Sequence, residues 1–183
     1  MSRLLFALAG DPGSGKSEGA RYLTNAHGFY EFTGSKYLKS EAAQQGLVLH
    51  ERVDYGNFQR KLRVCRSVSF ITDAIVQIDS DRVCNVGIRN RQDVNAHIKA
   101  GGIIVAFYCP DYVRFARVAG TDPKYPTDFE EFRLAEAVEY DDPDPLGQHT
   151  HYAMANATHW IDTRKPLEDT RRALDEIVAI HSS

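Results

Sequence analysis

The sequence predicts an α/β fold with one parallel sheet covered by helices on both faces, a three-layer α/β/α arrangement. The continuous apolar runs Leu4–Ala9 and Ile103–Tyr108 have the composition of strands that are buried on both faces. Segments with helical spacing of apolar residues separate most of the predicted strands, and this alternation is typical of a parallel sheet. The length of 183 residues predicts a single domain over 1–183.

The first half of the chain begins with the strand 4–9, followed by a glycine-rich turn and a helix that Gly28 ends. Residues 29–33 are aromatic and β-prone, which predicts a second strand, and Gly46 ends the helix after it. Apolar residues then recur at helical spacing in two segments. The first helix predicted here follows the glycine-rich turn 10–17 and runs through about residue 26, and the next three are 35–45, 54–64 and 68–78.

The second half continues the alternation with apolar strands at 82–88, 103–108 and 158–161. Gly101 ends one helix, Pro110 begins another, and Thr127 with Glu130 matches a helix-capping pattern. Glycine, proline and aspartate concentrate in two segments, which predicts loops at 119–126 and 141–147. The helices predicted here are 91–100, 110–118, 128–140 and 167–180.

Composition limits the function classes. No run of about 18 apolar residues is present, so we expect no membrane partner. The three cysteines are far apart and lack metal-binding spacing, which favours a reduced, cytoplasmic location (the host cytoplasm if the chain is phage-encoded). The net charge of −3 argues against broad, non-specific nucleic-acid binding.

The turn after the first strand matches G-x-x-x-x-G-K-[ST] in full. Its glycines allow successive backbone N–H groups to face phosphate oxygens at the N-terminus of a helix. Lys16 supplies a cation for the β- and γ-phosphates, and the Ser17 hydroxyl is suited to Mg²⁺. We therefore expect ATP and Mg²⁺ as cofactors, bound by Gly10, Asp11, Pro12, Gly13, Ser14, Gly15, Lys16 and Ser17.

Arginines further along the chain are placed to neutralise a transferred phosphoryl group. Arg89 follows the third strand, where ligands of parallel sheets bind, and Asp93 could orient it. Arg114 and Arg117 share a helical face before a turn-rich segment. Arg60, Arg63 and Arg66 form a basic helical face that either holds an acceptor or is simply solvated.

With these motifs, the chain resembles the P-loop nucleoside monophosphate kinases, most closely the phage-type deoxynucleoside monophosphate kinases and dephospho-coenzyme-A-kinase-like proteins. The resemblance rests on GDPGSGKS, on NVGIRNRQDVNAHIKAGGIIVAFYCPDYVRF, on DFEEFRLAE and on THWIDTRKPLEDTRRAL. It covers most of the chain, with residues 47–80 fitting least well. The implied fold is a P-loop NTPase of the nucleotide-kinase type with a short lid.

The resemblance also implies roles for individual residues. Arg89 would contact the acceptor phosphate or the transferred group, and Arg117 and Arg114 would close a lid at about 114–127. Ser35 and Lys36 would lie at an acceptor pocket within a helical segment at about 35–80. Many relatives carry an aspartate that supports Mg²⁺ where this chain has Val86, which leaves Asp11 as the candidate metal residue.

Three functions follow as hypotheses. The first is transfer of the ATP γ-phosphoryl group to a (deoxy)nucleoside monophosphate, with Lys16, Arg89, Arg114 and Arg117 as catalytic residues. Ser35, Lys36, Arg60, Arg63, Arg89 and Asp93 would bind that acceptor. The second is a kinase for a hydroxyl acceptor, on dephospho-coenzyme A or on a hydroxymethylated base in DNA. The third is a nucleotide-binding regulatory module without transfer. The sequence does not decide whether the chain forms a homodimer.

Overall fold

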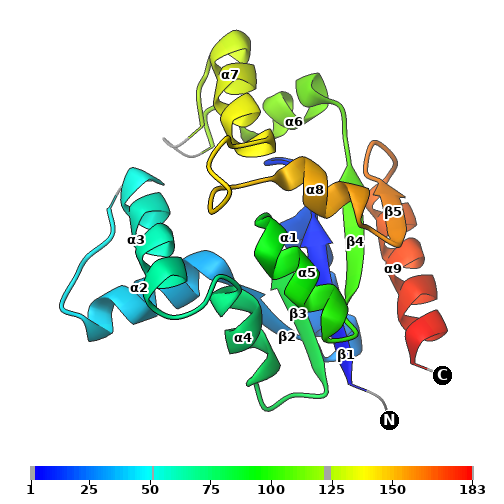
Figure 1. The fold of residues 1–183 in the computed structure, drawn as a ribbon. Coiled ribbons are helices and arrows are strands. Elements are labelled where there is room, and N and C mark those ends of the chain that lie inside the picture. The colour runs from blue at the N-terminus through cyan, green and yellow to red at the C-terminus, as the bar shows by residue number, and fades with distance from the viewer. Residues whose placement is uncertain (1–2, 51, 122–124, 183) are drawn as a thin grey trace.

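The computed structural model describes residues 3–50, 52–121 and 125–182. Figure 1 shows the predicted architecture, a sheet between helical layers, and all of the strand pairings are parallel. The strand order is β2-β3-β1-β4-β5. This arrangement confirms the predicted fold class. None of the helices in the described ranges is both long enough and apolar enough to span a membrane.

The five predicted strands are present as β1 (Leu4–Ala9), β2 (Tyr30–Thr33), β3 (Arg82–Val86), β4 (Ile103–Tyr108) and β5 (His159–Asp162). The first helices along the chain are α1 (Lys16–His27), α2 (Gly34–Gln44), α3 (Arg52–Cys65) and α4 (Phe70–Val76). The later helices are α5 (Arg91–Lys99), α6 (Asp111–Val118), α7 (Phe129–Tyr140), α8 (Thr150–Ala155) and α9 (Leu167–His181).

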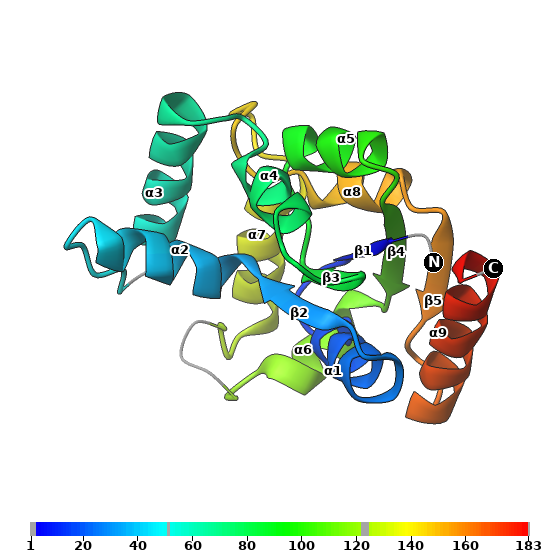
Figure 2. The same ribbon diagram turned by 90° about the horizontal axis from the view of Figure 1, so that it is seen from below.

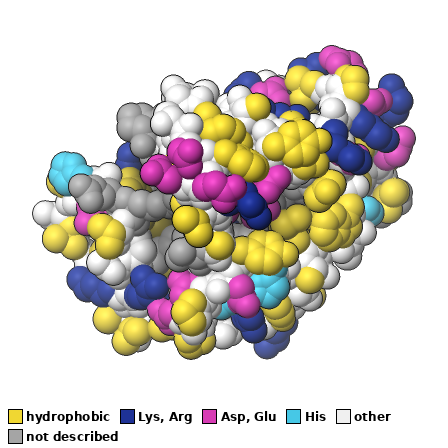
Figure 3. Space-filling model, turned by 90° about the horizontal axis from the view of Figure 1, so that it is seen from above, with side chains coloured by type: hydrophobic (Ala, Val, Ile, Leu, Met, Phe, Trp, Pro, Cys, Tyr) yellow, Lys and Arg dark blue, Asp and Glu magenta, His cyan; other side chains and the backbone are white. Residues whose placement is uncertain are grey.

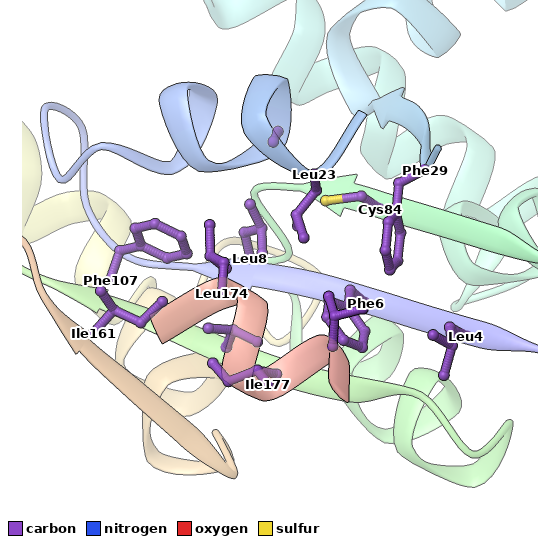
Figure 4. Packing of buried hydrophobic residues seen from close by; sticks show 13 residues of the cluster. Leu4, Phe6, Leu8, Leu23, Phe29, Cys84, Phe107, Ile161, Leu174 and Ile177 are labelled. Atoms are coloured by element: carbon purple, nitrogen blue, oxygen red, sulfur yellow. The ribbon is translucent and has the colours of Figure 1, made fainter. Parts of the chain in front are cut away.

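The two faces of the sheet are covered by different helices. Figure 2 shows α1 and α9 on one face, and α5 and α8 on the other. Leu23 of α1 and Leu174 of α9 are fully buried and pack with Phe6 and Phe107 of the sheet, as Figure 4 shows. All residues of β1 are buried, so the prediction that this continuous apolar run is a strand buried on both faces is confirmed.

Helices α2, α3 and α4 form a second apolar cluster beside β2. Phe58, Leu62, Phe70 and Ile75 are buried there against Leu5 and Val83 of the sheet. Figure 1 shows α2 and α3 extending away from the central layers. This packing anchors the segment that forms the wall of the pocket described below.

Some local predictions were wrong. Helix α7 is capped by Asp128, whose carboxylate accepts a hydrogen bond from the Glu131 amide (3.0 Å), and not by Thr127. Helix α4 is shorter than predicted, and α8 was not predicted because six residues carry too little periodicity to reveal a helix.

Candidate active site

The phosphate-binding loop joins β1 to α1 at the carboxyl edge of the sheet. Two of its glycines are required by space and by backbone conformation. Gly10 has φ 140°, and a Cβ there would lie 2.6 Å from the Phe107 carbonyl oxygen. Gly13 has φ 76°, and its Cβ would lie 2.8 Å from the Arg114 carbonyl oxygen. At these two positions the loop follows a path that a residue with a side chain could not adopt without strain.

Lys16 lies in the first turn of α1 with its side chain buried. Its Nζ donates hydrogen bonds to the Asp11 carbonyl oxygen (2.7 Å) and to Ser14 Oγ (3.3 Å). Burial, followed by the charge of Arg89, lowers the pKa of Lys16 to about 7, although Asp11 opposes the shift. An anionic phosphate would supply the counter-charge that this ammonium group lacks.

Arg114 and Arg117 both contact the phosphate-binding loop from α6. Arg114 is buried, donates to the Pro12 carbonyl oxygen (3.2 Å) and pairs with Glu136. Arg117 donates to the carbonyl oxygens of Gly13 (3.2 Å) and Thr163 (2.6 Å). The structure thus brings both predicted arginines to the loop, while residues 122–124 of the predicted lid lie outside the described residues.

The loop is suited to a triphosphate with Mg²⁺. Ser17 is exposed at the first turn of α1, so its hydroxyl is accessible beside the loop. Asp11 lies close enough to Lys16 for its charge to raise the lysine pKa. One or two oxygen ligands together with substrate phosphates are the usual protein environment of Mg²⁺. The residues present therefore fit the expected metal.

A pocket of about 260 Å³ lies beside the loop, at the carboxyl ends of β2 and β3. Its walls include Thr33 at the end of β2, Ser35 of α2, Tyr55 and Gln59 of α3, and Arg89 after β3. Ligands of open parallel sheets bind at this edge. The structure therefore places the predicted acceptor residues Ser35, Arg63, Arg89 and Asp93 around a single cavity.

Arg89 connects this pocket to the phosphate-binding loop. Its Nη1 donates to Glu139 Oε2 (2.7 Å) and to Gln148 Oε1 (3.1 Å). Glu139 comes from α7, and the Arg89 carbonyl oxygen accepts a hydrogen bond from the His149 amide (2.7 Å). Arg89 lines the pocket while its charge lowers the pKa of Lys16, so the pocket and the loop are electrostatically coupled.

Arg63 and Asp93 form a buried ion pair at the pocket, with Nη2 to Oδ2 at 2.6 Å and side chains 2% and 3% exposed. Asp93 also accepts from the Thr72 amide (3.1 Å). Burial raises the pKa of Asp93, and the neighbouring Arg63 guanidinium opposes that shift. The expectation that Asp93 orients Arg89 is replaced by this pairing with Arg63.

Other predicted acceptor residues do not line this pocket. Lys36 is exposed, with its Nζ 3.7 Å from Glu31 Oε1. Arg60 donates to Asp144 Oδ2 (2.5 Å), and Arg66 pairs with Glu41. The three arginines of the predicted basic face are thus each paired with a carboxylate. Figure 3 accordingly shows basic and acidic side chains interspersed over this side of the molecule.

Several residues at the pocket, among them Glu139, Gln148 and Asn85, were not predicted from the sequence. Glu139 and Gln148 reach Arg89 from distant parts of the chain, and no local pattern reveals such contacts. Asn85 lines the pocket from within β3. A sequence signal for Asn85 was present, because its amide stands among the apolar residues Val83, Cys84 and Val86 of the predicted strand.

Comparisons with known proteins establish the fold class. No protein-family model matches the chain, and no curated protein matches it. Shikimate kinase from Acinetobacter baumannii, solved in complex with shikimate, superposes with a TM-score of 0.60 and 16% identity, covering 98% of this chain and 93% of that chain. Shikimate kinase from Bacteroides thetaiotaomicron superposes with a TM-score of 0.64 and 11% identity, and the superposition covers 100% of both chains. A gluconokinase from Sinorhizobium meliloti 1021 superposes with a TM-score of 0.54 and 14% identity, covering 96% of this chain and 93% of that chain. The chain has the fold of P-loop kinases.

Proposed function

We propose that this protein transfers the γ-phosphoryl group of ATP to an acceptor held in the pocket beside Arg89. The position of Arg89 carries the proposal, because this residue lines the acceptor pocket and acts electrostatically on Lys16 of the phosphate-binding loop. Donor and acceptor would therefore meet at one edge of the sheet, which is the arrangement that phosphoryl transfer requires.

Catalysis would depend on positioning and on neutralisation of charge. The loop N–H groups and Lys16 would hold the β- and γ-phosphates of ATP. Arg114 and Arg117 already contact the loop backbone, so they would place positive charge beside the bound phosphates. Mg²⁺, held through Ser17 and supported by Asp11, would neutralise phosphate charge when bound.

A hydroxyl group on a small polar molecule is the acceptor that the pocket supports best. Arg63 is paired with Asp93 and Arg89 with Glu139, so the cations at the pocket are already balanced by carboxylates. The volume of about 260 Å³ lies below the roughly 300–1,000 Å³ of pockets for drug-sized ligands. The similar solved structures include a shikimate kinase with bound shikimate and a gluconokinase, which supports this choice at the level of the fold.

A (deoxy)nucleoside monophosphate is the second candidate acceptor. It is favoured by the presence of two arginines, Arg63 and Arg89, among the pocket residues, together with Tyr55 as an aromatic wall. An acceptor phosphate would have to compete with Asp93 and Glu139 for these arginines. A DNA acceptor has less support, because the Arg60, Arg63 and Arg66 face is not a continuous free basic surface.

The proposal is tested by a transfer screen with γ-labelled ATP and Mg²⁺. The acceptors are shikimate, gluconate, thymidine, the four deoxynucleoside monophosphates, dephospho-coenzyme A, and plain or hydroxymethylated DNA. We expect label on a hydroxyl of a small acceptor, with at least about a hundredfold lower turnover for Lys16→Met. ATP binding without label on any acceptor would favour the non-catalytic module, and undiminished turnover of Lys16→Met would refute the loop assignment.

A further inference from the structure

Asn85 is a buried polar residue whose surroundings are mostly apolar. It lies on β3 between Phe32 of β2 and Ala7 of β1 in the strand register. Its side chain is buried, with the residue 2% exposed, and it lines the acceptor pocket. Within the described part of the chain, its Nδ2 has no hydrogen-bond partner. Burying an amide nitrogen without a hydrogen-bond partner costs free energy. A ligand oxygen that accepts a hydrogen bond from this nitrogen would remove that cost.

Arg63 adds a second unpaired donor to the same pocket. Its Nη atoms are used, one on the Val68 carbonyl oxygen and the other on Asp93. Its Nε is buried and finds no partner among the described residues. Both Asn85 and Arg63 line the pocket, and each has one buried N–H donor that no described residue accepts, although neither nitrogen atom is exposed at the pocket surface.

The charge around these donors indicates what kind of oxygen they take. Asp93 lies 2.6 Å from Arg63 and neutralises it, and Glu139 stands in the same relation to Arg89 at 2.7 Å. A ligand carboxylate or phosphate placed here would meet Asp93 as well as Arg63, and like charges at short range repel. An uncharged ligand oxygen would accept a hydrogen bond from either donor without that repulsion.

We propose that Asn85 Nδ2 and Arg63 Nε form an acceptor-recognition subsite for an uncharged oxygen, a carbonyl or hydroxyl of the substrate. This subsite rests on the proposed function and deepens it, because it selects acceptors whose recognised end is neutral and rich in oxygen. Asn85 is a specificity-determining residue in this arrangement, and the Arg63–Asp93 ion pair excludes anionic groups from the subsite.

The test measures binding by isothermal titration calorimetry in the presence of Mg²⁺ and ADP, without turnover. The probes are three pairs that differ in charge: methyl shikimate and shikimate, sorbitol and gluconate, thymidine and thymidine monophosphate. For the wild-type protein we expect at least one uncharged probe to bind at least about tenfold more tightly than its anionic partner. Preference for the anionic member in every pair that binds, or no binding by any uncharged probe, overturns the proposal.

Asn85→Leu, which keeps a similar size and removes the donor, should weaken binding of the preferred probe at least about tenfold. It should melt at the same or a higher temperature, because it removes an unpaired buried polar group. The matched control Asn95→Ala changes an exposed asparagine of α5 and should leave binding within about twofold. Unchanged binding by Asn85→Leu would mean that only water occupies the subsite and would refute the proposal. If Asn85→Leu does not fold, the wild-type comparison alone decides.

The binding experiment and the transfer screen distinguish failure of the subsite from failure of the proposed function. A protein that binds the uncharged probes but labels no acceptor would refute the proposed function and leave the subsite standing. A protein that labels acceptors while Asn85→Leu binds them as well as wild type would refute the subsite alone.

Discussion

At the residue scale, Lys16 is the side chain whose ionisation we expect to respond most directly to nucleotide. Burial and Arg89 lower its pKa to about 7 in the free protein. A bound triphosphate favours the charged form and raises that pKa, so binding takes up a proton when the pH is above about 7. Below this pH the ammonium is already present, and affinity no longer depends on its titration.

We therefore expect the Kd for Mg·ATP to rise by up to about tenfold per pH unit between roughly pH 7.5 and 9. Calorimetry in buffers of different ionisation enthalpy should register the proton uptake directly. Lys16→Arg is the control, because arginine stays protonated over this range and should remove the pH dependence. A pH-independent Kd for the wild-type protein would contradict the assignment of Lys16 as the phosphate-binding cation.

At the element scale, the Arg63–Asp93 ion pair links three helices around the pocket. Arg63 belongs to α3, Asp93 to α5, and Thr72 of α4 donates its amide to Asp93. Asp93→Asn leaves a buried guanidinium without its counter-charge, which costs about 3–5 kcal/mol of unfolding free energy. Urea unfolding measures the change.

The matched control for that ion pair is Arg172→Gln. It breaks an exposed pair with Asp169 on α9, in which the arginine side chain is 70% exposed. The expected cost is below about 1 kcal/mol, because water and salt screen such pairs. A similar cost for both variants would show that the buried pair does not hold the pocket helices together.

Two helical glycines provide a second comparison at this scale. A Cβ at Gly56 of α3 would meet only the flexible end of Arg60, at 3.5 Å, so Gly56→Ala should stabilise the protein by about 1 kcal/mol. A Cβ at Gly19 of α1 would lie 2.6 Å from the buried Phe107 ring, so Gly19→Ala should destabilise it. Thermal unfolding of the two variants should therefore shift in opposite directions, and equal shifts would contradict the packing of α1 on the sheet.

At the scale of the whole molecule, local patterns predicted the five strands and the phosphate-binding loop because each depends on contiguous residues. The strand β1 is a continuous apolar run, and the loop is one motif directly after it. The pocket depends instead on tertiary contacts. Arg89 meets Glu139 and Gln148 across about fifty residues or more, and Arg63 meets Asp93 across thirty. The spacing of residues along the sequence does not predict contacts between residues so far apart.

The ion-pair partners of the basic helical face were not predictable from the sequence for the same reason. Helical spacing correctly predicted a helix for Arg60 and Arg63, whereas Arg66 lies just beyond the end of α3, and the spacing does not determine which partner each side chain meets. Their partners are Asp144 of the loop between α7 and α8, Asp93 of α5 and Glu41 of α2, which are far apart in the sequence. The net charge of −3 therefore does not conceal a free basic surface on α3.

We propose that the phosphate-binding loop and the pocket are the donor and acceptor halves of one site, and that Arg89 acts on both halves. Initial rates of Arg89→Ala with the acceptor identified by the transfer screen test it most directly. We expect kcat/KM for the acceptor to fall by at least about a hundredfold, while the Kd for Mg·ATP changes less than about threefold. Unchanged kcat/KM for the acceptor, measured on a folded variant, would contradict it.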